Sequence, residues 1–117
     1  GWDVSSANNF NGMFAQTSFN PDLSRWDVSS VTDFSGMFRG AAFSSNISQW
    51  DVSSGADFSG MFSKAGSFNA DLSEWDVSSG TDFSSMFSGA DLFNSDISEW
   101  DVSSGTDFSS MFSGADL

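Results

Sequence analysis

Five tryptophans divide the sequence into units that are nearly copies of one another. The units start at Trp2, Trp26, Trp50, Trp75 and Trp100. Each unit reads W-D-V-S-S-x-x-(D/N)-F-x-x-M-F and, after a short loop, F-(N/S)-x-(D/N)-(L/I)-S-x. A unit of about 25 residues cannot bury its own apolar side chains and must pack on its neighbours. We therefore expect residues 1–117 to form a single solenoid of about five stacked repeats.

The pattern within one unit predicts one short strand and one short helix. Alternation in Trp75-Asp76-Val77-Ser78 favours a strand with one buried face. The S-x-x-D spacing of Ser79 and Asp82 is typical of a helix start. A helical stripe follows, with apolar residues at i, i+3, i+4 and i+7 from Phe83 to Ala90. These features predict an α/β fold, a leucine-rich-repeat-like solenoid with one parallel strand and one helix per 24–25-residue coil.

Whole units also resemble the BspA-like bacterial surface-protein repeat. The resemblance is carried by 68–79 (F-N-A-D-L-S-E-W-D-V-S-S) and 82–87 (D-F-S-S-M-F), and it extends over essentially the whole chain. Two positions depart from the family pattern. Phe replaces the usual Met eight residues after each Trp, and Gly replaces a Val that survives only as Val31. The resemblance implies an extracellular or cell-surface location and a role in adhesion or protein contact, without catalytic residues.

Composition excludes several classes of function. The chain has no His and no Cys, which rules out a Ser-His-acid triad, a thiol nucleophile and thiolate metal sites. Its net charge of −13 disfavours nucleic acid and anionic membranes as partners. No apolar run approaches the ~20 residues that cross a bilayer. We therefore predict a protein that is not an enzyme and has no cofactor.

Most acidic residues fall into three columns of the repeat. One column begins the predicted helices, where a carboxylate is favoured by the free amides. Another lies in the return loop, where Asp and Asn are common turn residues. The third column follows each Trp. The members of the three columns are, in that order, Asp33, Asp57, Asp82 and Asp107; Asp22, Asp71 and Asp96; and Asp3, Asp27, Asp51, Asp76 and Asp101.

The column after each Trp is the candidate partner-binding site. If Trp and Val point inward, Asp3, Asp27, Asp51, Asp76 and Asp101 form an outward ladder. Carboxylates ~4.8 Å apart would repel by roughly 0.8 kcal/mol in a water-like dielectric. Three explanations stay open: local hydrogen bonds to the backbone or Ser, calcium between the rungs, or contact with a basic partner. No known calcium motif is present, so no metal site is predicted.

Asparagines suggest two smaller features. Asn46-Ile47-Ser48 is an N-x-S sequon and a possible glycosylation site at Asn46. The column Asn20, Asn69 and Asn94 resembles the asparagine ladder of leucine-rich repeats, which satisfies backbone groups.

These observations favour a non-enzymatic extracellular repeat module that acts as a structural spacer, a filament element or a protein-adhesion surface. The alternative is a calcium-dependent binding module that uses the Asp ladder. The expected partners are a protein with a basic surface, or neighbouring copies of the same array that stack end to end. Neither end carries the polar cap that normally closes a solenoid, so we expect the chain to be a fragment of a longer array.

Overall fold

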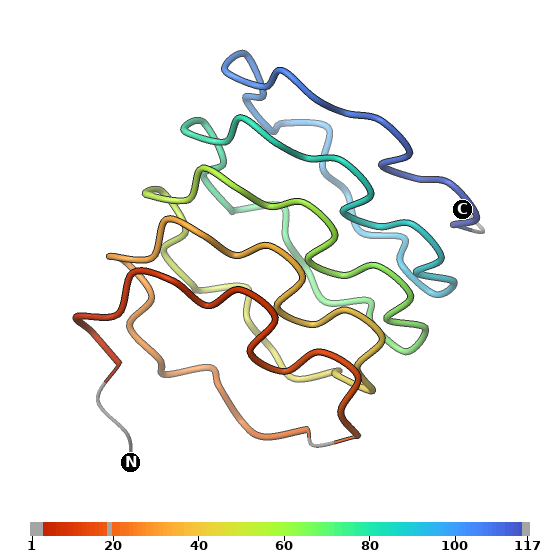
Figure 1. Cartoon of the computed structure of the whole chain (residues 1–117), viewed down its shortest axis with the longest axis horizontal. Coiled ribbons are helices and arrows are strands. Elements are labelled where there is room, and N and C mark those ends of the chain that lie inside the picture. The colour runs from red at the N-terminus through yellow and green to blue at the C-terminus, as the bar shows by residue number, and fades with distance from the viewer. Residues whose placement is uncertain (1–3, 19, 116–117) are drawn as a thin grey trace.

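The chain winds through successive coils that lie side by side, each following the path of the one before it (Figure 1). The computed structural model describes residues 4–18 and 20–115. We number the coils from one Trp to the next: coil 1 (4–18 and 20–25), coil 2 (26–49), coil 3 (50–74), coil 4 (75–99) and coil 5 (100–115). Trp2, which opens the first predicted unit, lies outside the described residues.

Main-chain hydrogen bonds join each coil to the next. In coil 3, alternate amides donate to carbonyls of coil 4: Phe58 to Asp82 (2.9 Å), Gly60 to Ser84 (2.8 Å) and Phe62 to Met86 (2.9 Å). The same pattern recurs at the equivalent residues of coils 1, 2 and 4. Parallel bridges follow one column of the repeat through all the coils, connecting Asn9, Asp33, Asp57, Asp82 and Asp107 in turn.

The predicted helix is absent, and consecutive tight turns take its place. In coil 2, Met37 N donates to Phe34 O (3.2 Å) and Ala41 N donates to Phe38 O (3.0 Å). Each turn has a residue with positive φ at its third position, Gly36 (62°) and Gly40 (64°), as a type II turn requires. An α-helix cannot contain such residues, and the amides it would need for i→i−4 bonds point to the next coil instead.

The predicted leucine-rich-repeat-like α/β solenoid is therefore wrong. Throughout residues 4–18 and 20–115 there is no helix, and strand pairing is limited to isolated bridges. The described residues therefore include no helix that could span a membrane. The molecule is compact, with extents of 35 × 31 × 21 Å and a radius of gyration of 12.8 Å, close to the ~13 Å expected of a globular domain this size. This shape gives no support to the predicted adhesive or filament role.

Phenylalanine ladders run through the core. Rings at equivalent positions stack nearly parallel: the centroids of Phe38 and Phe62 lie 5.7 Å apart, and those of Phe62 and Phe87 also lie 5.7 Å apart. A second ladder joins Phe58 to Phe83 at 5.6 Å. Such offset stacking of aromatic rings contributes beyond the burial of their area. The i, i+3, i+4 spacing that suggested a helix instead reflects the period of the turns that feed these ladders.

Candidate functional site

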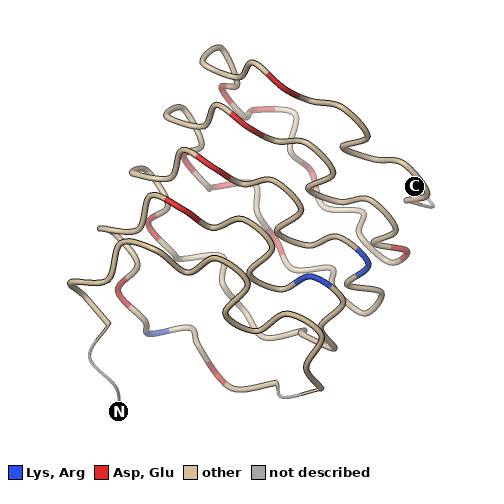
Figure 2. Cartoon of the chain, viewed as in Figure 1, with Lys and Arg blue, Asp and Glu red and all other residues tan. Residues whose placement is uncertain are grey.

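The predicted aspartate ladder is exposed on the outside of the coils. The described members all face solvent; they are Asp27, Asp51, Asp76 and Asp101. Asp3 lies outside the described residues. Figure 2 shows that acidic residues recur at the same places in successive coils and so form rows along the stack.

Each aspartate of this ladder bonds to its own coil. Asp51 Oδ1 accepts hydrogen bonds from the amide (3.0 Å) and hydroxyl (2.5 Å) of Ser53. Asp76 Oδ1 accepts the same pair from Ser78, at 3.0 and 2.6 Å. This geometry is that of an Asx turn, which needs no ligand. Of the three explanations for the ladder, local hydrogen bonding is the one with contacts in the structure.

These bonds also set the charge of the ladder. The hydroxyl and then the amide of Ser78 lower the pKa of Asp76 below its ordinary value, although the neighbouring carboxylate of Asp101 acts in the opposite direction. The hydroxyl and amide of Ser103 likewise lower the pKa of Asp101. A carboxylate that accepts two hydrogen bonds is stabilised in its charged form. Asp76 and Asp101 thus stay ionised despite the repulsion between adjacent rungs.

The other two acidic columns use the same local geometry. Asp57 Oδ1 accepts bonds from the amide (2.9 Å) and hydroxyl (2.6 Å) of Ser59. Asp71 Oδ1 accepts bonds from the amide (2.9 Å) and hydroxyl (2.7 Å) of Ser73. The predicted role of one of these columns as a helix start is wrong, because its members lie on the parallel bridges; they are Asp33, Asp57, Asp82 and Asp107. In each case the residue between Asp and Ser is the apolar one that enters the core.

The sequence contains a signal for this shared motif, although we predicted a separate role for each column. Wherever one of the three columns has Asp, the residue two positions later is Ser. Asp-x-Ser with an apolar middle residue therefore marks three corners of coils 3 and 4, and Asn46 takes the place of Asp at the third corner of coil 2. The motif is recognisable because a carboxylate two residues before a serine can accept both its amide and its hydroxyl.

The acidic rows do not converge on a cation site. Among residues 4–18 and 20–115, no group of three or more acidic side chains is arranged to hold a metal ion. Calcium takes six to eight oxygen ligands, and the carboxylates of one column each come from a different coil. The geometry thus offers no preformed calcium cage.

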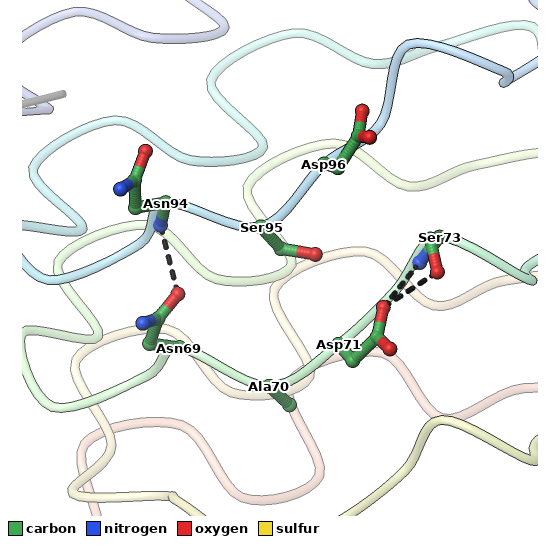
Figure 3. A pocket seen from close by; sticks show the side chains of 7 residues that line it. All are labelled: Asn69, Ala70, Asp71, Ser73, Asn94, Ser95 and Asp96. Carbon is green, nitrogen blue, oxygen red and sulfur yellow. Dashed lines mark hydrogen bonds between the residues drawn. The ribbon is translucent and has the colours of Figure 1, made fainter.

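A shallow, open pocket of about 370 Å³ lies between the return loops of coils 3 and 4 (Figure 3). Asp71 and Asp96 line one side of it, and Asn69 and Asn94 lie toward the other. Asn69 Oδ1 accepts a hydrogen bond from the amide of Asn94 at 2.8 Å. The asparagine column therefore links neighbouring coils through backbone groups, although its side chains are exposed rather than buried.

A second hollow, of about 360 Å³, contains one of the few basic residues. Arg39 lines it together with Asn11, Ser35 and Ser59, and the glycines of coils 1 and 2 form part of its wall. The guanidinium lies against Gly60, where a Cβ atom would meet it. This hollow was not foreseen from the sequence, because only one of the units carries an arginine at this position.

The possible glycosylation site is accessible but structurally ordinary. Asn46 is exposed, and its Oδ1 accepts a hydrogen bond from the amide of Ser48 at 2.9 Å. It thus replaces Asp in the return-loop column without changing the turn.

The comparisons with known proteins identify one relationship. The sequence matches the family described as "Mycoplasma protein of unknown function, DUF285" over residues 1–43 and 17–117. No curated protein and no solved structure matches the chain.

Proposed function

This protein belongs to the DUF285 family, and from that premise we propose that it is a non-enzymatic structural spacer that acts outside the cell. The family match spans the repeats rather than one segment of the chain. A role that all coils can serve together therefore fits the chain better than one confined to a single coil.

The observation that carries this proposal is the repetition of one set of contacts from coil to coil. The amides of Phe34, Phe58 and Phe83 each donate to the aspartate carbonyl of the next coil, at 2.9, 2.9 and 2.8 Å. An active site joins a nucleophile, a base and a stabilising donor in one distinctive constellation. Here the serine hydroxyls that neighbour a carboxylate repeat in the same geometry in successive coils, which favours a structural role for them.

The extracellular setting rests on the resemblance of the units to BspA-like surface repeats. The surface charge is compatible with it, because a net charge of −13 keeps a protein soluble and favours basic partners over acidic ones. A protein with a basic surface, or another copy of this chain, is the kind of partner that we expect.

Thermal unfolding of the whole chain, followed with and without millimolar calcium, tests the proposal. A spacer held by contacts between coils should unfold in one cooperative transition, with a midpoint that calcium does not change. Several separate transitions would contradict the spacer. An increase in the midpoint with calcium, lost in the double variant Asp51→Asn and Asp76→Asn, would instead establish the cation-dependent alternative.

A further inference from the structure

The Arg39 hollow crosses three successive coils on the side of the stack. Its polar lining comes from one column of the repeat, Asn11, Ser35 and Ser59, and Arg39 completes it. Because coils 1, 2 and 3 all contribute, the hollow is a lateral feature and does not depend on where the coils begin or end. Its volume of about 360 Å³ lies within the range of small-molecule sites.

Glycines make room in this hollow for the guanidinium group. A Cβ atom at Gly60 would collide with Nη2 of Arg39, and one at Gly36 would lie 3.8 Å from its Nε. Gly12 continues the same column in coil 1, whereas coils 4 and 5 have serine there. The glycines and the arginine thus occur together in one part of the repeat array.

The guanidinium is exposed and has no acidic partner in the part of the chain that the structure describes. Lys64 lies on the neighbouring coil, because the amide of Gly40 donates to the carbonyl of Ser63 at 2.8 Å. Figure 2 shows the two basic segments next to each other, apart from the acidic rows. An anion at Arg39 is therefore attracted by two of the three basic residues of the chain. The planar fork of an arginine binds a carboxylate through two parallel hydrogen bonds.

The serine side of the hollow has the opposite preference. The hydroxyl of Ser35 donates to Asp33 at 2.6 Å, and that of Ser59 donates to Asp57 at 2.6 Å. Because each hydroxyl proton is already used, the two oxygens can only accept a hydrogen bond from a ligand. The carboxylates behind them repel any further negative charge. This side therefore favours the neutral hydroxyl groups of a ligand.

We propose that the Arg39 hollow binds a singly charged hydroxy-carboxylate, of which a uronic acid sugar is an example. The ligand carboxylate lies on the guanidinium of Arg39, and its hydroxyl groups donate to the oxygens of Ser35 and Ser59. A polyanion is disfavoured by the adjacent carboxylates and by the net charge of −13. A neutral sugar lacks the anion that the guanidinium binds. The spacer role does not require this site.

Nuclear magnetic resonance of the whole, ¹⁵N-labelled chain tests the proposal with sodium glucuronate as the probe, at constant ionic strength. We expect saturable shifts at the amides of Gly12 and Gly36 and at the Nε–H of Arg39. Glucose lacks the carboxylate, whereas acetate and inorganic phosphate lack the sugar hydroxyls. Each of these three compounds should bind about tenfold more weakly than glucuronate, or less, because a hydrogen bond to a charged group is lost or the serine oxygens receive no donor.

Three variants taken from the repeat itself locate the site. Arg39→Ser introduces the residue of coils 3 to 5 and should weaken glucuronate binding about tenfold or more. Arg25→Gln is the matched control, because it removes the same charge outside the hollow and introduces the equivalent residue of coil 2; binding should be unchanged. Lys64→Gly relieves a left-handed φ of 59° and should raise the melting temperature. It should weaken binding less than Arg39→Ser, because Lys64 does not line the hollow.

The opposite outcomes overturn the proposal. An absence of saturable shifts, or unchanged affinity in Arg39→Ser, removes the site. Acetate or phosphate that binds as tightly as glucuronate would show attraction to positive charge alone, without a role for the serines. Equal losses in Arg39→Ser and in Arg25→Gln or Lys64→Gly would have the same meaning. None of these results bears on the spacer role, which is tested separately by thermal unfolding.

Discussion

The indole N–H of Trp75 donates a hydrogen bond to the main-chain carbonyl of Ile47, 28 residues earlier in the chain, at 3.0 Å. Trp50 makes the same bond to Leu23 at 2.9 Å, and Trp100 makes it to Leu72 at 2.9 Å. Each of these three tryptophans thus bonds to the main chain 27 or 28 residues earlier, about one repeat back. Because a buried indole N–H needs a partner, this bond also explains how the buried Trp50 and Trp75 are tolerated.

Replacing Trp75 by Phe should destabilise the protein by about 0.5–1.5 kcal/mol through the lost buried hydrogen bond, because the carbonyl of Ile47 keeps only the amide of Trp50 as a donor. Urea unfolding measures the change. Trp100→Phe is the matched control: the bond to Leu72 is only partly buried, so water can replace the indole and the cost should be smaller. Equal costs at the two positions would argue against the buried bond as the cause.

Truncating a ring in the middle of a ladder should cost more than truncating one at its end. Phe62 is fully buried between Phe38 and Phe87, so Phe62→Ala should cost about 3–5 kcal/mol of unfolding free energy. Phe112→Ala should cost clearly less, because Phe112 is 37% exposed and stacks on one side only. Both variants are measured at low protein concentration by denaturant unfolding. A similar cost for both would show that the stack does not hold the coils together.

Gaining a glycine and losing one at the positive-φ position of a tight turn should have opposite effects on stability. Ser85 has a φ of 57°, where the equivalent residues in coils 2 and 3 are Gly36 and Gly60. Ser85→Gly should therefore stabilise the protein by about 0.5–1 kcal/mol. Gly36→Ala should destabilise it by about 1–2 kcal/mol, because a left-handed φ of 62° is strained for alanine and a Cβ atom there makes only ordinary contacts.

Gly66→Ala is the control for the glycine pair. Gly66 has no positive φ, and a Cβ atom there would meet nothing within 4 Å. Its substitution should be neutral or slightly stabilising. Differential scanning calorimetry compares the three variants, and a loss of stability in Ser85→Gly would contradict the turn geometry.

Because of the Asp-x-Ser turns, we expect their contribution to the free energy of unfolding to fall at low pH. The Ser78 hydroxyl and amide depress the pKa of Asp76 in the folded chain below its ordinary value of 3.8. The stability that this provides is fully present above the ordinary pKa and is lost as the pH falls through the lower, folded pKa. Neutralising the net charge of −13 acts in the other direction, so the informative quantity is the difference between variants.

Asp76→Asn isolates this effect. Asn46 already makes the same turn, so Asn should keep the geometry and nearly all of the stability at neutral pH. The stability lost by the wild type on going from pH 5 to pH 2, where the shifted aspartates titrate, should be smaller in the variant. Denaturant unfolding at constant ionic strength measures it, and an identical loss in both proteins would rule out the proposed contribution of Asp76.

The sequence predicted the contacts of the core better than its secondary structure. The Trp, Met and Phe columns are buried in the inner coils, as in Phe38, Met61 and Trp75. The apolar spacing from Phe83 to Ala90 suggested a helix, because periodicity alone does not tell a helical stripe from repeated turns. Ser85 and Lys64 conceal the difference further, since they adopt positive φ at positions where a glycine would have signalled a turn.

The sequence predicted the exposure of the aspartate ladder but did not single out its hydrogen bonds to serine. The exposure of Asp51, Asp76 and Asp101 follows from alternation around Trp and Val, and it is observed. Their bonds to serine depend on the local backbone angles, which the expected strand would not have provided. The Arg39 hollow is lined in part by Gly12 of coil 1 and Ser59 of coil 3, which lie far from Arg39 in the sequence and give no local signal.

Native-state hydrogen exchange, resolved by residue at low protein concentration, tests most directly the claim that coils hold one another. The amides of Phe58, Gly60 and Phe62 donate to coil 4 and should exchange slowly. Those of Phe108, Ser110 and Phe112, at the same positions in coil 5, should exchange rapidly. Similar rates in the two sets, or protection that follows a continuous i→i−4 helical pattern, would contradict the account.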